Sequence, residues 1–563
     1  MDDLPQELVD NISSFLAYDD LKNTLTVSAK FQVAAELCSR AFEKYTLTED
    51  NAATFLTTYN GRRAHYLRRI RFRPMLPALD DPDDDPEDEL RPCRENSEDL
   101  KLANEHFSKQ IEFLLSTLAK LEQRIRRPMN GRGADIKLTI YTPRRLVLDE
   151  AFYCRHRMYV SWPLQLLSPD RLPSIDFIHT LVFKNGHQYD PLSDDCNEME
   201  PSLRSLDLRI MLDLASKMNG LRNLKCRVGG ETLQSHIRWT STYANHIRSG
   251  WDGPLRDSRK HFADALNVLR LPDLEEGNLD FMYPLKAADA VDQRVRMPDL
   301  VAPAIYDAFS SALRILSLPL KRLRLQGAFD ASLFWPANDN SSFPHWPNLE
   351  ILNVSFYAAA PSGAWYFRGL EPEPVIGGFE ITDGHYQPLT TTEEDQETDR
   401  ECDYPDWEMT NEAQFRVIPV DEIITPFLAA FTKAANSMPA LREAALWSPC
   451  KLQPDDMGGS YEALDETPLQ AYTNGKLAWG IVYTAPGTPH KLYGAAGTTE
   501  SDARQIWWNV TDWRPAGPLH SSFQTIGLDT HGDKLLEYWS NEHGQQGLVR
   551  RGVFEGFTSD GFW

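Results

Sequence analysis

The chain has 563 residues and a formal net charge of −24. At about 150 residues per domain, this length predicts three or four folding units. Such an acidic chain repels phosphate backbones, which argues against a general nucleic-acid binder. No uncharged apolar run approaches the ~20 residues that span a bilayer. Neither nucleic acid nor a membrane is therefore expected as a partner.

The cysteines also exclude some classes of site. There are seven, and no pair has C-x-x-C spacing. Two acidic residues, Asp2 and Asp3, follow Met1, which is the opposite of the basic start of a secretory signal peptide. We therefore expect reduced thiols in a cytoplasmic and/or nuclear protein, with no disulfide framework and no zinc site.

The first forty residues predict three short helices. Pro5 suits the first turn of a helix, where its missing N–H costs nothing. One apolar stripe follows it at i, i+4, i+7 and i+8 spacing, made of Leu8, Ile12, Phe15 and Leu16. Leu21, Leu25 and Phe31 carry the pattern through two further helices. So small a unit buries too little surface to stand alone, so another surface is expected to cover part of the stripe.

This spacing resembles the F-box, the helical module at the N-terminus of ubiquitin-ligase substrate receptors. The resemblance covers roughly residues 3–44, within a predicted F-box domain of residues 1–45. It places the following residues on the family's recurrent apolar positions, where they would bind a Skp-family adaptor: Leu4, Pro5, Leu8, Ile12, Phe15, Leu16, Leu21, Val27 and Phe31. The chain departs from the family at Ala29, where a basic residue or Cys is usual, and at Phe42, the aromatic nearest to the usual Trp. The alternative is an ordinary helical hairpin packed on its own protein.

Residues 46–135 are expected to connect this module to the next domain. Six arginines come first, at positions 62, 63, 68, 69, 71 and 73, and they suit either a localisation signal or phosphate patch, or the exposed side of a strand.

Two acidic segments, 78–96 here and 388–410 further on, are expected to be disordered because like charges repel and few apolar residues oppose them. Between them, residues 97–127 have helical periodicity without Gly or Pro.

From residue 136 to about 450 a loose repeat appears, in which a helix is followed by a short strand with Leu-x-x-Leu-x-Leu spacing. The helix–strand pairs are 211–218 with 221–228, 303–318 with 320–325, and 423–438 with 441–446; further strands without an obvious helix are 178–183, 203–208 and 349–354. Such units bury their leucines by stacking on neighbours. The pattern resembles degenerate leucine-rich repeats, as in many fungal F-box receptors, and predicts an irregular solenoid. The alternative is an irregular α/β domain.

Basic residues alternate with the repeat leucines. Since alternate side chains of a strand point to opposite faces, they are predicted to lie outside, either as solvated surface or as part of a face for an acidic or phosphorylated target. These residues are Arg204, Arg209, Arg222, Lys225, Arg227, Lys321, Arg322 and Arg324.

Residues 451–563 change character. Six of the chain's 14 tryptophans lie within residues 470–563, among β-branched residues and Gly/Pro turn signals, which predicts strands and turns. This segment is expected to cap the solenoid, with its tryptophans either in the core or lining a recognition pocket. The fold class is thus α+β or α/β: a three-helix module, a repeat body and a Trp-rich cap.

No phosphate-loop, dinucleotide-binding or nucleophile-elbow motif occurs, and no residue pattern indicates a cofactor, a metal or a catalytic group. The resemblance therefore implies a non-catalytic, substrate-recognition subunit of a Skp–cullin–F-box ubiquitin ligase. Its partners would be a Skp-family adaptor, through it a cullin, and a target protein. A scaffold whose F-box-like helices pack internally is the alternative from another class, and an enzyme is a more distant one.

Overall fold

The computed structural model describes most of the chain. The described residues are 4–77, 96–125, 135–145, 162–185, 204–229, 252–283, 285, 291–336, 343–369, 371–386, 390, 392–393, 413–451, 476–489, 501–540 and 549–558. The acidic segments predicted to be disordered, 78–96 and 388–410, lie almost wholly outside these residues. Among the described residues, no helix is both long and apolar enough to cross a membrane.

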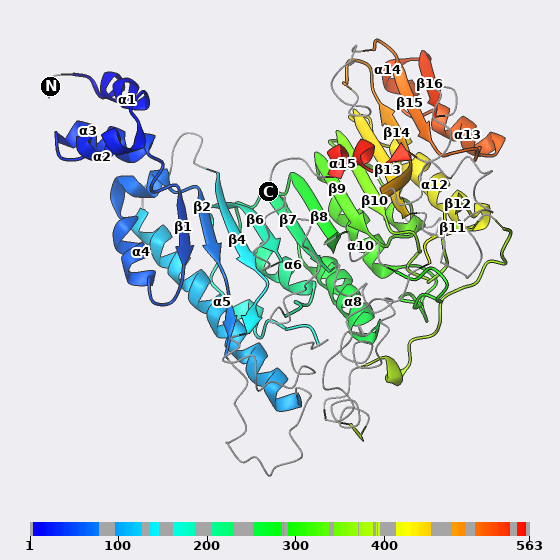
Figure 1. The fold of residues 1–563 in the computed structure, drawn as a ribbon, viewed down its shortest axis with the longest axis horizontal. Helices are drawn as coiled ribbons and strands as arrows, with labels where there is room; N and C mark the ends of the chain where they lie inside the picture. The colour runs from blue at the N-terminus through cyan, green and yellow to red at the C-terminus, as the bar shows by residue number, and fades with distance from the viewer. Residues whose placement is uncertain are drawn as a thin grey trace, which may run out of the picture.

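One large sheet runs through the molecule, and most of its strands are parallel and follow one another in chain order (Figure 1). The parallel strands, from one edge inward, are β1 (Lys44–Leu47), β2 (Arg69–Phe72), β4 (Ile136–Tyr141), β6 (Ile178–Lys184), β7 (Asn223–Gly229), β8 (Glu276–Tyr283), β9 (Arg322–Gly327), β10 (Ile351–Phe356) and β13 (Glu443–Lys451). The order continues through β14 (Lys476–Thr484), β15 (Arg504–Asn509) and β16 (Leu535–Trp539), where β14 is antiparallel to both neighbours; β17 (Val549–Arg550) also pairs with β14.

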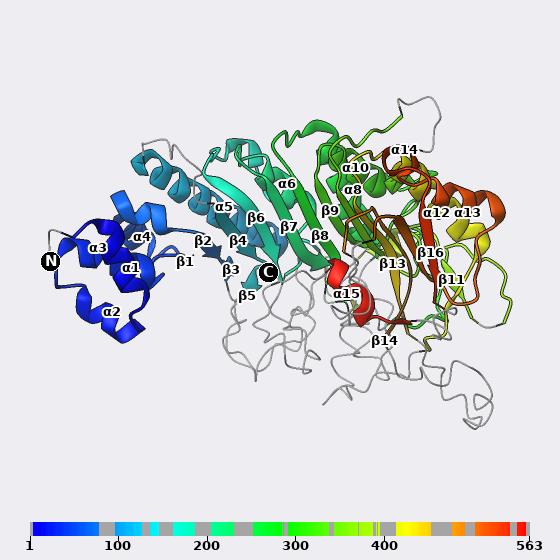
Figure 2. The same ribbon diagram turned by 90° about the horizontal axis from the view of Figure 1, so that it is seen from above.

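Helices cover one face of this sheet (Figures 1 and 2). They are α4 (Ala52–Thr58), α5 (Ser97–Ile125), α6 (Arg209–Ala215), α8 (Asp252–Val268), α10 (Ala308–Ser317) and α12 (Asp421–Asn436). Because neighbouring parallel strands cannot be joined by a tight turn, the chain must cross back over the sheet between them. Here several of those crossings form the helical layer.

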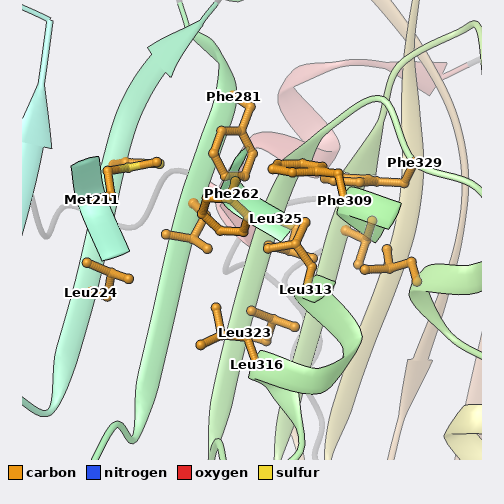
Figure 3. Close-up of a cluster of buried hydrophobic side chains, with 14 of the residues drawn as sticks. Met211, Leu224, Phe262, Phe281, Phe309, Leu313, Leu316, Leu323, Leu325 and Phe329 are labelled. Carbon is orange, nitrogen blue, oxygen red and sulfur yellow. The ribbon is translucent and has the colours of Figure 1, made fainter. Parts of the chain in front are cut away.

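The core lies between the helices and the sheet. One row of paired, buried side chains crosses ten strands: Phe72, Ile140, Phe183, Cys226, Leu279, Leu325, Val354, Leu446, Ile481 and Trp508. Figure 3 shows the middle of this core, where Phe309 of α10 lies near Phe262 of α8 and Phe281 of β8, with ring centroids 4.9 and 5.1 Å from that of Phe309. The sheet is thus held by apolar contact with a continuous helical layer.

A buried ion pair ties two of the helices together. Asp307 caps α10 by accepting hydrogen bonds from the backbone N–H groups of Phe309 and Ser310, and it also receives one from Arg259 of α8 at 2.6 Å. Asp307 and Arg259 are both buried. Since a buried charge is tolerated only when paired and hydrogen-bonded, this pair fixes the relative position of α8 and α10.

Several other helices lie at the two ends. At the N-terminus, α1 (Gln6–Ser14), α2 (Tyr18–Thr24) and α3 (Ala29–Cys38) form a unit beside β1, followed by the short 3-10 helix η1 (Gly61–Tyr66) (Figure 1). At the other end lie α13 (Gly517–Gln524) and α14 (Leu528–His531), whereas α15 (Gly552–Thr558) contacts β9 and β10 within the sheet. Two small pairings complete the described strands: β3 (Met75–Leu76) with β5 (Arg144–Arg145), and β11 (Phe367–Arg368) with β12 (Ile418–Pro419).

Helix α15 lies on the face of the sheet opposite the other helices (Figure 2). Its Phe554 stacks on Trp447 of β13 with ring centroids 5.5 Å apart, within a small core separate from the main one. Two C-terminal tryptophans, Trp479 and Trp508, are fully buried in the main core. At these positions the core interpretation of the Trp-rich segment is confirmed and the pocket interpretation is wrong.

Much of the expected secondary structure is present, with two kinds of difference. The helix at 97–127 and the strands near 178, 221, 320, 349 and 441 are confirmed as α5, β6, β7, β9, β10 and β13. The strand expected at 203–208 is wrong: in its described part only an isolated bridge forms, between Leu206 and Leu164. Helix α8 and strand β8 were not anticipated. The fold is mixed α/β around a large, mostly parallel sheet.

We expect the core to depend strongly on Phe309. Replacing this buried ring in Phe309→Ala should lower the free energy of unfolding by about 3–5 kcal/mol, because the cavity loses both transfer energy and contacts. The matched control is Phe343→Ala, whose ring is 75% exposed and whose loss should change stability by less than about 0.5 kcal/mol. Denaturant unfolding followed by tryptophan fluorescence measures both, and equal effects would contradict the described core.

Candidate functional site

Helices α1, α2 and α3 form a small unit, here called the helical module, with its own core. Val9, Phe31 and Ala34 are buried together, and Leu4 packs against them. The hydroxyl of Ser28 caps α3 by accepting a hydrogen bond from the backbone N–H of Phe31 at 3.3 Å. Only a few buried side chains therefore hold the three helices together.

Helix α1 leaves an apolar stripe uncovered. Leu8, Ile12 and Phe15 are 49%, 47% and 83% exposed, and their spacing places them on one side of the helix. We call these three residues the α1 stripe. Val27, just before α3, is also exposed. Single exposed apolar residues are ordinary, but a row of three on one helix face is a feature of surfaces that bind other proteins.

The structure divides the nine residues predicted to contact an adaptor. Pro5, Val27 and the α1 stripe are exposed, while Leu4 and Leu16 are half-buried. Leu21 and Phe31 are buried, so neither is available for the adaptor contact that the resemblance implies. The physical reason is that α2 packs on α3, and Leu21 is the α2 residue that this packing covers.

A buried carboxylate joins the helical module to the rest of the chain. Glu36 of α3 is almost fully buried and pairs with two arginines of η1, Arg62 at 3.2 Å and Arg63 at 2.6 Å. Arg63 also lies over the ring of Phe42, 4.5 Å from its centroid. Burial acts to raise the pKa of Glu36, but the hydrogen bonds and charges of the two arginines outweigh it and hold the pKa below its ordinary value.

The face of the sheet opposite the main helical layer, here called the open face, is polar over much of its length. One row of paired residues reads Arg71, Thr139, Val182, Lys225, Asn278, Arg324 and Asn353 from β2 to β10. These positions alternate with the buried row of the core, as strand geometry requires. Toward β13 and β14 the row becomes apolar at Ala445 and Val482, which α15 helps to cover.

A pocket of about 710 Å³ lies on the open face beside the helical module. Its lining includes seven basic and three acidic side chains, which come from α3, the segments around β1 and β2, and strands β4, β6 and β7: Arg40, Arg68, Arg69, Arg71, Lys137, Lys184 and Lys225, with Glu36, Glu43 and Asp135. The pocket is therefore strongly positive in a chain whose net charge is −24. We call it the basic pocket.

The environment of two lysines in the basic pocket disfavours their charged form. Burial, with the nearby charges of Lys225 and Arg69, lowers the pKa of Lys137 to about 8. Burial and the charges of Arg227 and Arg71 also lower the pKa of Lys184. Among the described residues, neither lysine has a carboxylate within ion-pair distance. Each is thus a half-buried cation held among other cations.

The basic residues predicted to bind a target are only partly brought together. Lys225 and Arg227 lie on β7, with Arg222 just before it, and Arg322 and Arg324 lie on β9, with Lys321 just before it; Lys321 and Arg322 are paired with Glu275 and Glu276. Arg204 and Arg209 lie elsewhere. Arg204 is buried in a loop, where it donates to the carbonyl of Trp162, and Arg209 is on α6, where it pairs with Asp213.

The comparisons with known proteins do not extend these observations: no protein-family model matches the chain, and no curated protein is significantly similar to it in sequence. Within the described residues, no group of three or more His, Cys, Asp or Glu side chains is placed to hold a metal ion.

Sequence reasoning missed three of the basic residues that line the basic pocket: Arg40, Lys137 and Lys184. Lys137 and Lys184 each follow a buried aliphatic or aromatic residue on a strand, as Lys225 does. The arginine-rich segment was anticipated in part: Arg69 and Arg71 do form the exposed side of a strand, β2. What joins these residues is the strand register, in which Arg69 is paired with Lys137 and Tyr141 with Lys184.

We expect Glu36→Gln to loosen the helical module. The variant loses the charge that two arginines share, and a hydrogen bond to a charged group contributes roughly 1.5–3 kcal/mol. Amide hydrogen exchange of α3 should be faster at pH 7, while that of α5 stays unchanged. Because the pKa of Glu36 is lowered in the folded chain, its stabilisation is present above the ordinary value of 4.5 and is lost as pH falls below it.

Glu43→Gln is the matched control for this prediction. Glu43 lies 3.9 Å from Arg40 and 3.8 Å from Arg69, and its side chain is more exposed than that of Glu36. Such long, partly solvated pairs contribute about 0–1 kcal/mol, so exchange in α3 should barely change. If Glu36→Gln and Glu43→Gln behave alike, or if α3 of the Glu36 variant keeps the acid sensitivity of the parent, Glu36 does not anchor the module.

Proposed function

We propose that this protein is the substrate-recognition subunit of a Skp–cullin–F-box ubiquitin ligase. The helical module would bind a Skp-family adaptor and through it a cullin, and the sheet body would bind the target. The observation that carries the proposal is the exposed α1 stripe, Leu8, Ile12 and Phe15, on the module whose sequence resembles the F-box.

The energetics of the α1 stripe favour a partner. Full burial of one large apolar side chain contributes about 1.5–3 kcal/mol. The half-exposed Leu8 and Ile12 and the largely exposed Phe15 together leave several kcal/mol to be gained by a protein that covers them. The module lies at one end of the molecule, beside the first strand of the sheet, so a partner can approach it without crossing the body (Figures 1 and 2).

The body supports the second half of the proposal. Parallel strands follow one another in chain order, and helices lie on one face, which is the arrangement expected of a leucine-rich-repeat-like solenoid. The open face from β2 to β9 carries polar and charged side chains, including Lys225 and Arg324. A target held there would be brought near the ubiquitin-conjugating enzyme of the ligase. Catalysis would belong to that enzyme, and this chain would raise the effective concentration of the target lysine.

A non-catalytic scaffold whose helices pack internally is the second candidate. It is favoured by the small core of the module, in which Val9, Phe31 and Ala34 are buried together without any partner chain. It leaves the exposure of Leu8, Ile12 and Phe15 without a role. The two candidates differ in one measurable property, which is affinity for a Skp-family adaptor.

The decisive variants are Leu8→Asp and Phe15→Asp in the full chain. Each places a carboxylate in the α1 stripe, where a covering partner would have to bury it unpaired. We expect each variant to bind a purified Skp-family adaptor on the order of 100-fold more weakly, which corresponds to about 2.8 kcal/mol. Co-purification and surface plasmon resonance measure this loss, and thermal unfolding checks that the body is intact.

Leu102→Asp provides the matched control for both variants. Leu102 is 54% exposed on α5, outside the module, so it introduces the same charge at a similarly exposed leucine. Adaptor binding by this variant should equal that of the parent. Undiminished binding by both stripe variants, or no binding by the parent chain, would reject the ligase proposal and favour the scaffold.

A further inference from the structure

The basic pocket has the geometry of a built site. Strand register brings its cations close together: Arg69 is paired with Lys137 across β2 and β4, while Arg71 is paired with Thr139, one pleat further along. Neighbouring strands are about 4.8 Å apart, so cations from β2 and β4 surround one volume. The third wall is the end of α3, which contributes Leu37, and the segment just after it, which contributes Arg40.

The charges in this pocket are not balanced by the described chain. Arg69 has one distant carboxylate, Glu43 at 3.8 Å, and Glu36 is already shared by Arg62 and Arg63. Arg71, Lys137 and Lys184 have no ion-pair partner among the described residues. Concentrating like charges in a partly buried volume costs free energy, and an anion bound there would offset that cost.

We propose that the basic pocket is a binding site for a compact oligophosphate, meaning a small anion with two or more linked or adjacent phosphoryl groups. The lining has four more basic than acidic side chains. One phosphoryl monoester carries about −1.5 to −2 charges at pH 7, so it would neutralise at most about half of that excess. Two or three phosphoryl groups match it.

The residue types also suit phosphate. Arg69 and Arg71 present guanidinium groups that bind phosphate oxygens in a bidentate manner, and lysine ammonium groups contribute further donors. Thr139 and Thr180 lie on the floor of the pocket and offer hydroxyl donors. The lining surrounds one volume of about 710 Å³, which is the scale of a small-molecule site and favours a small anion over a nucleic-acid backbone. This inference does not depend on the proposed ligase function.

The test is calorimetric titration of the full chain with tripolyphosphate, pyrophosphate, inorganic phosphate and sulfate at fixed ionic strength. We expect one tripolyphosphate per chain, with affinity falling in that order and inorganic phosphate at least tenfold weaker than tripolyphosphate. Tripolyphosphate should also raise the midpoint of thermal unfolding, since a ligand of the folded state alone stabilises it.

Lys137→Met and Lys184→Met test the pocket directly, because methionine retains the apolar stem and removes the charge. Each should weaken tripolyphosphate binding at least tenfold. Without the anion, Lys137→Met should unfold at a higher temperature than the parent at pH 7, since the folded-state pKa of Lys137 is lowered and its charge therefore opposes folding. Lys321→Met, at a lysine outside the pocket and paired with Glu275, is the matched control and should leave binding unchanged.

The pH dependence provides an independent readout. Lys137 has a pKa of about 8 in the empty pocket, so as pH rises from 7.5 to 9.5 the parent should lose more tripolyphosphate affinity than Lys137→Met, and near pH 8.5 it should take up more protons on binding than that variant. The charged or titratable groups facing the same volume are Glu36, Arg40, Glu43, Tyr66, Arg68, Arg69, Arg71, Asp135, Tyr141, Lys184 and Lys225. Equal affinity for sulfate and tripolyphosphate, or equal binding by Lys137→Met, Lys321→Met and the parent, would overturn the proposal, and so would no binding.

Discussion

The structure depends on one constraint: a single long sheet buries one face against helices along nearly its whole width. The row from Phe72 to Trp508 shows this most directly, because one apolar residue from each of ten strands lies in register beneath the helical layer. A strand exposes alternate side chains on opposite faces, so this burial decides what the other face contains. The polar open face is a consequence of the core.

The two edge strands of the sheet are protected in different ways. Exposed strand edges invite pairing with other chains, and proteins cover or shorten them. At the first edge, β1 is short and the helical module lies beside it, tied to η1 through the buried Glu36. At the other end, the edge strand β16 has five residues, and His520 and Gln524 of α13 hydrogen bond to its Glu537. On the open face, α15 adds a small second core around Trp447 of β13. The described body therefore leaves its polar face accessible mainly toward the module.

The local charge of the basic pocket is opposite in sign to the net charge of the chain. The chain is acidic as a whole, yet cations gather where the open face meets α3, and burial holds the pKa of Lys137 well below that of an exposed lysine. Folding tolerates this because the apolar layer beneath stabilises the strands regardless of the charges above them. Surfaces that cost stability without contributing to the core are common where proteins bind ligands. The α1 stripe is a second surface of this kind, with apolar in place of charged side chains. The stripe lies on α1, and the basic pocket borders α3 of the same module.

Local periodicity in the sequence was enough to predict α5, the three N-terminal helices and the strands β6, β7, β9, β10 and β13, because apolar spacing reports directly which side of an element is buried. It failed at 203–208, where the leucine pattern is present but only an isolated bridge forms, and at β8, whose Gly277 interrupts the pattern. Only the tertiary structure decided that Leu21 is buried while Phe15 is exposed, since both belong to the apolar pattern of the first helices and packing on α3 covers only Leu21. It alone brought together Arg71, Lys137 and Lys184, which are far apart in sequence, because strand register is a long-range property that composition and spacing do not contain.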